Sequence, residues 1–232
     1  MARKVLLFTA QFGDIALDTL CAKIQSWGYD GIEIACNDNH LNLEKLSPEY
    51  CEEVLATLKK YNLELCAVSN HSVGQCVTDP IDFRHKSILP PYIWGDGDPE
   101  GVHQRAAEEM IKTGKAAAML GVKTVVGFTG SPIWHLLYSY PPVPPETISD
   151  GFKEVARRFK PILDSYQELG VRFALEVHPT EIAFDIASAE MLLEALDYHP
   201  AFGFNFDPSH MGYQGVDYLA FIRQFGDRIY HV

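Results

Sequence analysis

Short apolar runs alternate along the chain with longer segments in which apolar residues recur every three or four positions. The short runs predict seven β-strands, at residues 5–8, 31–35, 63–68, 122–128, 171–177, 201–206 and 228–232. The longer segments predict helices at residues 17–27, 48–61, 102–120, 148–169, 187–196 and 216–225. Because strands that alternate with helices form parallel βα units, the pattern predicts an α/β fold with one parallel sheet.

Glycines and long connections distinguish the two edges of this predicted sheet. Gly28, Gly121 and Gly170 each follow a predicted helix, where a left-handed residue closes a short turn into the next strand. The long connections, residues 70–100 and 129–147, follow the third and fourth strands instead. Enzymes on parallel barrels build their pockets from such loops at the carboxyl ends of the strands, so we expect the functional site there.

Two predicted strands end in an acid with a histidine close behind. Glu176 and His178 end the fifth strand, and Asp207 and His210 follow the sixth. A strand buried on both faces has no structural need for such a polar ending. Because the ends of neighbouring parallel strands meet at one edge, these residues predict a metal site or an acid–base site at the mouth of a barrel.

Length and charge narrow the class of protein. The 232 residues fit a single domain over residues 1–232, since barrels of this kind run to about 250 residues. The net charge of −12, from 31 acidic and 19 basic residues, disfavours nucleic acid and membrane surfaces as partners. A small-molecule ligand is therefore expected, with a homo-oligomer left open.

The cysteines and the hydropathy indicate a soluble, cytoplasmic protein. The five cysteines are odd in number and form no CxxC pair, which favours free, reduced thiols. The apolar run at residues 5–8 is too short for a signal peptide. No stretch reaches the roughly 18 apolar residues that a membrane span needs.

Several segments resemble the xylose isomerase-like TIM barrels, a family of sugar phosphate isomerases and epimerases. They are residues 28–34, 69–71, 175–178, 207–210 and 230–232. The resemblance implies a (β/α)8 barrel, of which this chain carries seven strands and ends in the seventh. We therefore expect an incomplete barrel, C-terminally shortened, whose parent continues for about 50 residues by typical barrel length.

The resemblance also implies a ligand set for one divalent metal ion. Glu176 and Asp207 match the ligands from strands five and six, and Glu176 would also be the catalytic acid or base. The other ligands, a histidine of strand seven and an acid of strand eight, lie beyond the chain or are absent from it. Mn²⁺, Mg²⁺ or Co²⁺ suits hard oxygen ligands with one imidazole, and Zn²⁺ is a further candidate.

Other residues are expected to contact substrate or to approach the site. His210 matches a histidine that contacts substrate beside the metal, and His178 and His71 also stand at strand ends. Trp134, on the loop after strand four, would pack against a sugar face. Glu33 and His231 are further candidates, although Glu33 lies in the middle of a strand and equally suits a buried ion pair.

The function implied is that of a divalent-metal-dependent isomerase or epimerase of a sugar or sugar phosphate. It would remove a proton next to a carbonyl and pass through an enediolate. One alternative is a dehydratase or lyase acting on an inositol or keto-sugar at the same site. Another is a non-catalytic sugar-binding barrel, which the missing fourth ligand favours. The acidic charge argues against the related apurinic-site endonucleases.

Overall fold

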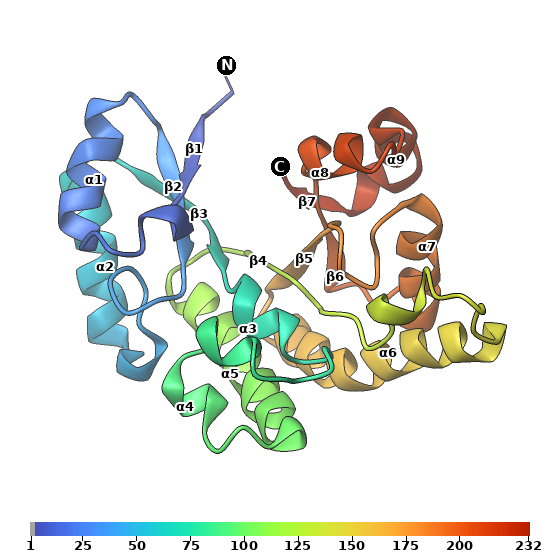
Figure 1. Cartoon of the computed structure of the whole chain (residues 1–232). Coiled ribbons are helices and arrows are strands. Elements are labelled where there is room, and N and C mark those ends of the chain that lie inside the picture. Colours follow the sequence, from blue (N-terminus) through green and yellow to red (C-terminus); the bar gives the residue numbers. More distant parts are fainter. Residues whose placement is uncertain (1–2) are drawn as a thin grey trace.

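A single sheet contains all the strands found within residues 3–232. In the computed structural model, which describes residues 3–232, seven parallel strands are hydrogen-bonded in chain order from β1 to β7. Their bounds are β1 (Leu6–Phe8), β2 (Gly31–Ala35), β3 (Glu64–Ser69), β4 (Thr124–Gly127), β5 (Arg172–Glu176), β6 (Phe202–Asn205) and β7 (Ile229–His231). The sheet curls, with β1 and β7 at its two edges (Figure 1). The prediction of an α/β, TIM-barrel-like and incomplete fold is confirmed.

Long helices line the outer side of the curled sheet, and short ones lie among the loops (Figure 1). The long helices are α1 (Leu17–Ser26), α2 (Pro48–Lys60), α5 (Pro99–Met119), α6 (Pro145–Glu168), α7 (Ile186–Ala195) and α9 (Tyr218–Phe225). The short helices are α3 (His71–Gln75), α4 (Pro91–Trp94) and α8 (Pro208–Tyr213). Single 3₁₀ turns occupy Ala10–Phe12, Leu43–Lys45, His85–Ser87, Trp134–Leu136 and Gly226–Arg228.

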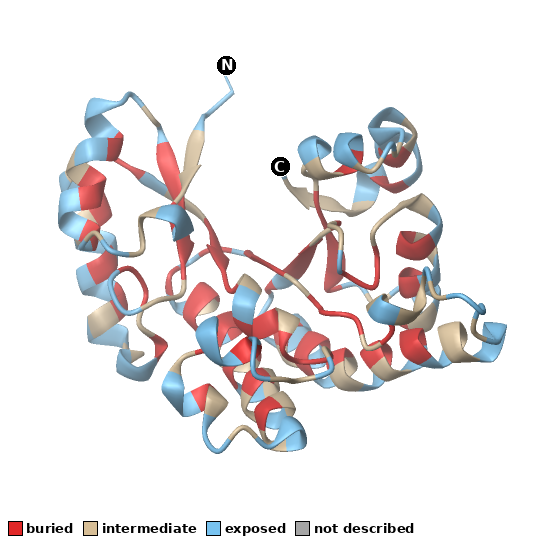
Figure 2. Cartoon of the chain, in the orientation of Figure 1, coloured by how far each residue is buried: buried red, intermediate tan, exposed pale blue. Residues whose placement is uncertain are grey.

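Side chains on the two faces of the sheet belong to separate apolar clusters. The large cluster, which includes Phe173 and Leu175 of β5, joins the sheet to the helices. Figure 2 shows this buried layer on the strands and on the helix faces that meet them. The small cluster lies on the inner face and includes Ala174. Because successive side chains of a strand point to opposite faces, Glu176 shares the inner face with Ala174.

Capping residues set where the helices begin, and they correct two predicted boundaries. The predicted start of α2 at Pro48 is confirmed, with the Ser47 hydroxyl accepting from the Tyr50 amide at 3.2 Å. Helix α5 begins at Pro99, earlier than predicted, because the Asp98 carboxylate accepts from the Gly101 amide at 2.9 Å. Helix α6 likewise begins earlier, at Pro145. Proline suits the first turn of a helix because the amide it lacks has no helical partner there.

The predicted long connection over residues 70–100 contains two short helices, α3 and α4, and the 3₁₀ turn His85–Ser87. Helix α3 starts directly after β3 and lies against the end of β4. A Cβ atom on Gly74 would come within 2.3 Å of the Phe128 carbonyl oxygen, so only glycine allows this approach. The close contact holds His71, the first residue of α3, over the carboxyl edge of the sheet.

The structure also bears on the expectations of free thiols and of no membrane-spanning segment. All five cysteines have free thiols, and Cys21, Cys51 and Cys76 are buried. Burial raises the pKa of Cys21 to about 11, which makes its thiol unreactive at neutral pH. Within residues 3–232, no helix combines the length and the apolar character needed to cross a bilayer.

Candidate metal and substrate site

Glu176 lies at the centre of a polar cluster at the carboxyl edge of the sheet. It is the last residue of β5, and its side chain is 14% exposed. One carboxylate oxygen, Oε2, accepts from His71 Nε2 and from Asn205 Nδ2, each at 3.2 Å. The other oxygen, Oε1, lies 3.2 Å from His210 Nε2. Residues from three separate regions of the chain therefore converge on one carboxylate.

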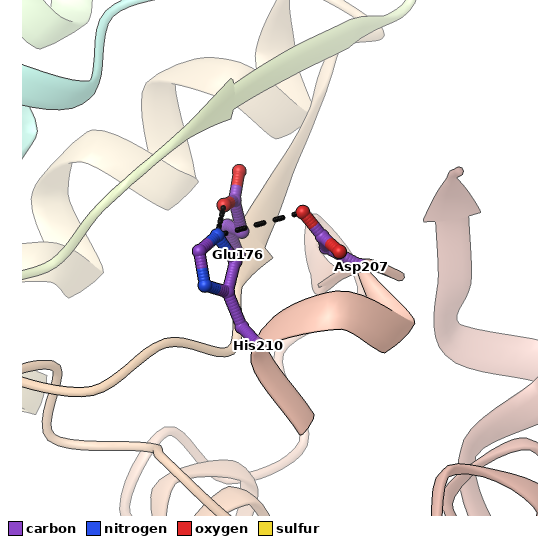
Figure 3. A group of neighbouring side chains, drawn as sticks. All are labelled: Glu176, Asp207 and His210. Carbon is purple, nitrogen blue, oxygen red and sulfur yellow. Dashed lines mark ion pairs between the residues drawn. The ribbon is translucent and has the colours of Figure 1, made fainter. Parts of the chain in front are cut away.

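Helix α8 brings Asp207 and His210 next to Glu176. Asp207 caps this helix, with Oδ1 accepting from the Ser209 amide at 2.8 Å. Its other oxygen, Oδ2, lies 3.5 Å from His210 Nε2. Ligand atoms of Glu176, Asp207 and His210 all lie within 4.8 Å of one another (Figure 3). These three residues are called the donor cluster below.

The donor cluster is rich in negative charge. In residues 3–232, the ion pairs of Glu176 and Asp207 are formed with histidines, not with lysine or arginine. Burial acts to raise the pKa of Glu176, but the hydrogen bond from His71 and the nearby imidazoles lower it overall. Burial also opposes ionisation of Asp207, yet its bonds from Ser209 lower the pKa of that carboxyl. Both acids are therefore ionised at neutral pH.

Aromatic rings form a wall beside the donor cluster. The Phe128 ring centroid lies 4.8 Å from that of His71 and 5.0 Å from that of His178. The His178 ring in turn lies 4.1 Å from His210 and bonds to the Pro179 carbonyl. Burial lowers the pKa of His178, so this imidazole is neutral at pH 7. The wall combines apolar surface with two imidazoles that a polar ligand can contact.

A cleft of about 1010 Å³ opens above these groups. Its lining includes Glu176, His71, His178 and His210, together with residues of the loops after β1, β2 and β3. The volume lies at the upper end of the range of roughly 300–1,000 Å³ found for small-molecule pockets. The cleft thus has room for a small ligand directly over the donor cluster.

The residues of the donor cluster fit a divalent cation. Two carboxylates and one imidazole are donors that Zn²⁺ and Mn²⁺ accept, and a nearby cation would balance the paired acids. The Asn205 Oδ1 atom, beside Glu176, is buried without a hydrogen-bond partner. Such an orphaned oxygen indicates that a further polar group belongs at this point of the site.

Three of the expected site residues, Glu33, His231 and Trp134, belong neither to the donor cluster nor to the lining of the cleft over Glu176. His231 Nε2 lies 2.9 Å from Glu33 Oε2, so these two form an ion pair across the inner face of the sheet. This is the buried pair that the position of Glu33 also suggested. Trp134 does not line the cleft over Glu176; it lines a neighbouring cavity instead.

Asn205 is a site residue that sequence reasoning missed. It lies two positions before Asp207, so strand alternation places both residues on the inner face. Asn205 could have been predicted from the sequence by counting two residues back from Asp207 along the strand. Phe128 was also missed, because one aromatic residue at a strand end does not differ in sequence from a core residue.

The chain is similar to known proteins over its whole length. Residues 21–232 match the family model for the xylose isomerase-like TIM barrel. The uncharacterized protein YfiH of Bacillus subtilis (strain 168) is 26% identical, over 99% of this chain and 71% of the relative.

Solved structures with the same fold include several named enzymes. The probable 3-DHS dehydratase AsbF of Bacillus anthracis superposes with a TM-score of 0.70 at 20% identity, over 98% of this chain and 71% of that one. The 3-keto-D-glucoside 4-epimerase YcjR of E. coli gives 0.70 at 17% identity, over 100% and 78%. The IolI protein, described with a binding zinc atom, gives 0.62 at 18% identity, over 98% and 71%. These likenesses show the fold.

Proposed function

The chain belongs to the xylose isomerase-like TIM barrel family, and from this premise we propose that it is a divalent-metal-dependent sugar isomerase or epimerase. The observation that carries the proposal is the donor cluster of Glu176, Asp207 and His210, of which Glu176 and His210 line the cleft. Two ionised carboxylates held together without lysine or arginine are costly for a fold unless a cation or a reaction uses them.

Each residue of the site has a definite part in this proposal. Glu176 and Asp207 hold the ion with His210, and Glu176 also exchanges a proton with the carbon next to the substrate carbonyl. His71 fixes the Glu176 carboxylate through its 3.2 Å hydrogen bond and presents its ring to the cleft. His178 and Phe128 form the wall that orients the sugar and excludes water.

A bound divalent ion supplies the positive charge that stabilises an oxyanion developing on the substrate. Mn²⁺, Mg²⁺, Co²⁺ and Zn²⁺ are the candidates. The IolI structure of the same fold is described with a binding zinc atom, which supports a metal in this chain but does not identify which one. The ligand donors offered here, two carboxylates and an imidazole, are compatible with all four.

The test measures metal content and proton exchange on the same preparations. The chain is purified without chelator, analysed by elemental mass spectrometry, and incubated with a panel of ketoses in D₂O under NMR. We expect near-stoichiometric metal and deuterium at the carbon next to the carbonyl. Glu176→Gln should lose the metal and slow exchange by about 100-fold or more. Glu52→Gln, on the exposed face of α2, is the matched control. Exchange that survives Glu176→Gln would refute the proposal.

A dehydratase of a keto-sugar or inositol is the second candidate, because the AsbF structure of the same fold is named a probable dehydratase. Such a reaction needs the same proton removal, followed by loss of a neighbouring hydroxyl as water. The NMR experiment separates the two reactions. Deuterium retained in a product of unchanged composition supports the isomerase or epimerase, whereas a product smaller by one water supports the dehydratase.

A further inference from the structure

A second cavity of about 700 Å³ adjoins the cleft over Glu176. The two share part of their lining, namely Ser72, Ser87, Ile88 and Phe128. The second cavity extends away from the donor cluster, between the loops that follow β3 and β4. Because one cavity of about 1010 Å³ already suffices for a single sugar ring, the added space requires its own explanation.

A buried hydroxyl on the wall of this second cavity has no hydrogen-bond partner among residues 3–232. Ser131 is 1% exposed, and its Oγ atom accepts and donates no hydrogen bond. Burying a hydroxyl without a partner costs roughly 1–3 kcal/mol in proteins. Since Ser131 lines the cavity, a ligand there would supply the missing hydrogen bond.

Asp79 gives the cavity a fixed acceptor beside Ser131. Its Oδ1 atom accepts from the Ser131 amide at 2.8 Å. Its Oδ2 atom accepts from Gln75 Nε2 at 2.7 Å and from His85 Nε2 at 3.2 Å. These three bonds hold the carboxylate in one orientation, and its side chain is still 17% exposed on the cavity. A rigid acceptor next to a free hydroxyl suits a ligand that carries hydroxyl groups of its own.

Trp134 adds an apolar wall. Its ring packs edge-on against Phe184, with centroids 5.4 Å apart, and against Tyr138, at 6.4 Å. These contacts hold the indole in place while it lines the cavity. A held aromatic ring beside polar groups matches the mixed apolar and hydroxylated surface of a sugar.

The charges of the cavity argue against an anionic ligand. The Arg84 guanidinium donates to Asp82 from Nε at 3.0 Å and from Nη2 at 2.7 Å, so its charge is already matched. Among the described residues that line this cavity, no lysine or arginine is left over for a phosphate or carboxylate. Asp79 and Asp82 further repel anions.

We propose that this second cavity is a distal subsite for an uncharged glycosyl group, so that the substrate is a glycoside or disaccharide. The reacting ring lies over Glu176, and the second ring contacts Trp134, Ser131 and Asp79 across the shared Phe128 wall. The inference deepens the proposed function and rests on it for the identity of the reacting ring.

The test compares binding of disaccharides with binding of their constituent monosaccharides to the metal-supplemented full chain. Maltose, cellobiose, lactose and sucrose are the probes, and calorimetry or saturation-transfer NMR measures affinity. We expect at least one disaccharide to bind ten-fold or more tightly than its monosaccharides. Ser131→Ala should lower that ratio about five-fold, the equivalent of one hydrogen bond of roughly 1 kcal/mol, and Trp134→Ala should lower it further.

Ser131→Ala is the sharper variant, because it removes a hydroxyl without a partner and should not lower stability. A wild-type ratio near one for every probe, or a ratio that neither variant changes, would overturn the subsite. Disaccharide binding that depends on both residues, without deuterium exchange, would support the subsite while refuting the isomerase. Deuterium exchange on monosaccharides, with disaccharides binding no more tightly than monosaccharides, would support the isomerase while refuting the subsite.

Discussion

Asp207 uses its two carboxylate oxygens for different purposes. Oδ1 caps helix α8 through the Ser209 amide, and Oδ2 faces His210 in the donor cluster. The same side chain therefore contributes both to local stability and to the proposed metal site. A substitution that keeps an oxygen at Oδ1 and replaces Oδ2 separates the capping of α8 from metal binding.

Asp207→Asn should keep the cap and lose the metal, whereas Asp207→Ala should lose both. The amide oxygen of asparagine still accepts from Ser209, so the free energy of unfolding without metal should change by less than about 0.5 kcal/mol. Alanine should lower it by about 1 kcal/mol. Urea denaturation in EDTA measures stability, and calorimetric titration measures metal affinity. If wild type and Asp207→Asn bind metal with equal affinity, Asp207 is not a metal ligand.

Glu181 is a fully buried acid that sequence reasoning did not single out. Its Oε2 atom accepts from the Thr129 amide at 2.7 Å and from the Gly130 amide at 2.8 Å. Its Oε1 atom has no hydrogen-bond partner in the described part of the chain. Burial, with Asp79 nearby, raises the pKa of Glu181 to about 8. The carboxyl ties the loop after β5 to the turn that leads to Ser131 and Trp134.

The raised pKa of Glu181 predicts a stability that falls as pH rises. Between the ordinary value of 4.5 and about 8, the folded chain keeps a proton that the unfolded chain releases. The stabilisation is complete below pH 4.5, is lost as pH approaches 8, and does not change further above it. Urea denaturation from pH 5 to 9 should show wild type losing up to about 1.4 kcal/mol per pH unit relative to Glu181→Gln. Parallel curves would contradict the buried proton.

At the scale of elements, the contact between α3 and β4 positions much of the cleft. Gly74 lets α3 lie on the Phe128 carbonyl, and this places His71 and Phe128 side by side. The packing depends on one missing methyl group. Substituting Gly74 therefore tests whether the position of α3, and not any single side chain of the site, determines the shape of the cleft.

Gly74→Ala should destabilise the chain by about 1–3 kcal/mol, because its Cβ would come within 2.3 Å of a backbone oxygen. It should also weaken sugar binding, since α3 must move away from β4. Gly226→Ala is the control: its Cβ would meet nothing within 4 Å, and its φ of −50° suits alanine. Thermal denaturation compares the two. Equal stability would show that α3 shifts without cost.

The strands were predictable within about two residues because each is a short apolar run, and three of them follow a glycine that ends the preceding helix. Short helices were not: α3 and α8 have five and six residues, too few to show a helical period. Asp207 followed by Pro208 was nevertheless a start signal for α8. The candidate site was predictable in part, because Glu176 ends one strand and Asp207 closely follows the next. The Glu181 and Asp79 network was not, since its partners are distant in sequence and its residues resemble ordinary loop positions.

At the scale of the whole molecule, the site joins regions far apart in the chain. His71 follows β3, Glu176 ends β5, and Asp207 and His210 lie beyond β6. A ligand held by several of them stabilises the folded chain as a unit, since the unfolded chain does not bring them together. A ligand at the proposed site would therefore add to the stability of the whole fold.

Metal at 100 times its dissociation constant should stabilise the chain by about 2.7 kcal/mol. For a chain of this size the midpoint of thermal unfolding should rise by about 5–10 °C. Differential scanning calorimetry with Mn²⁺, Mg²⁺, Co²⁺ or Zn²⁺ measures the shift, and EDTA should reverse it. Asp207→Asn should show little shift. A similar shift in that variant would place the ion elsewhere.

The ion pair of Glu33 and His231 bears on the order in which the molecule assembles. It joins β2 to β7, strands that are not neighbours in the sheet, so it forms only after the intervening strands have curled into place. Contacts between residues so distant in sequence slow folding, because the loop between them must be ordered first. During synthesis on the ribosome, Glu33 emerges long before His231. The Glu33 carboxylate on the inner face of the nascent sheet therefore has no His231 partner until β7 has been added to the sheet.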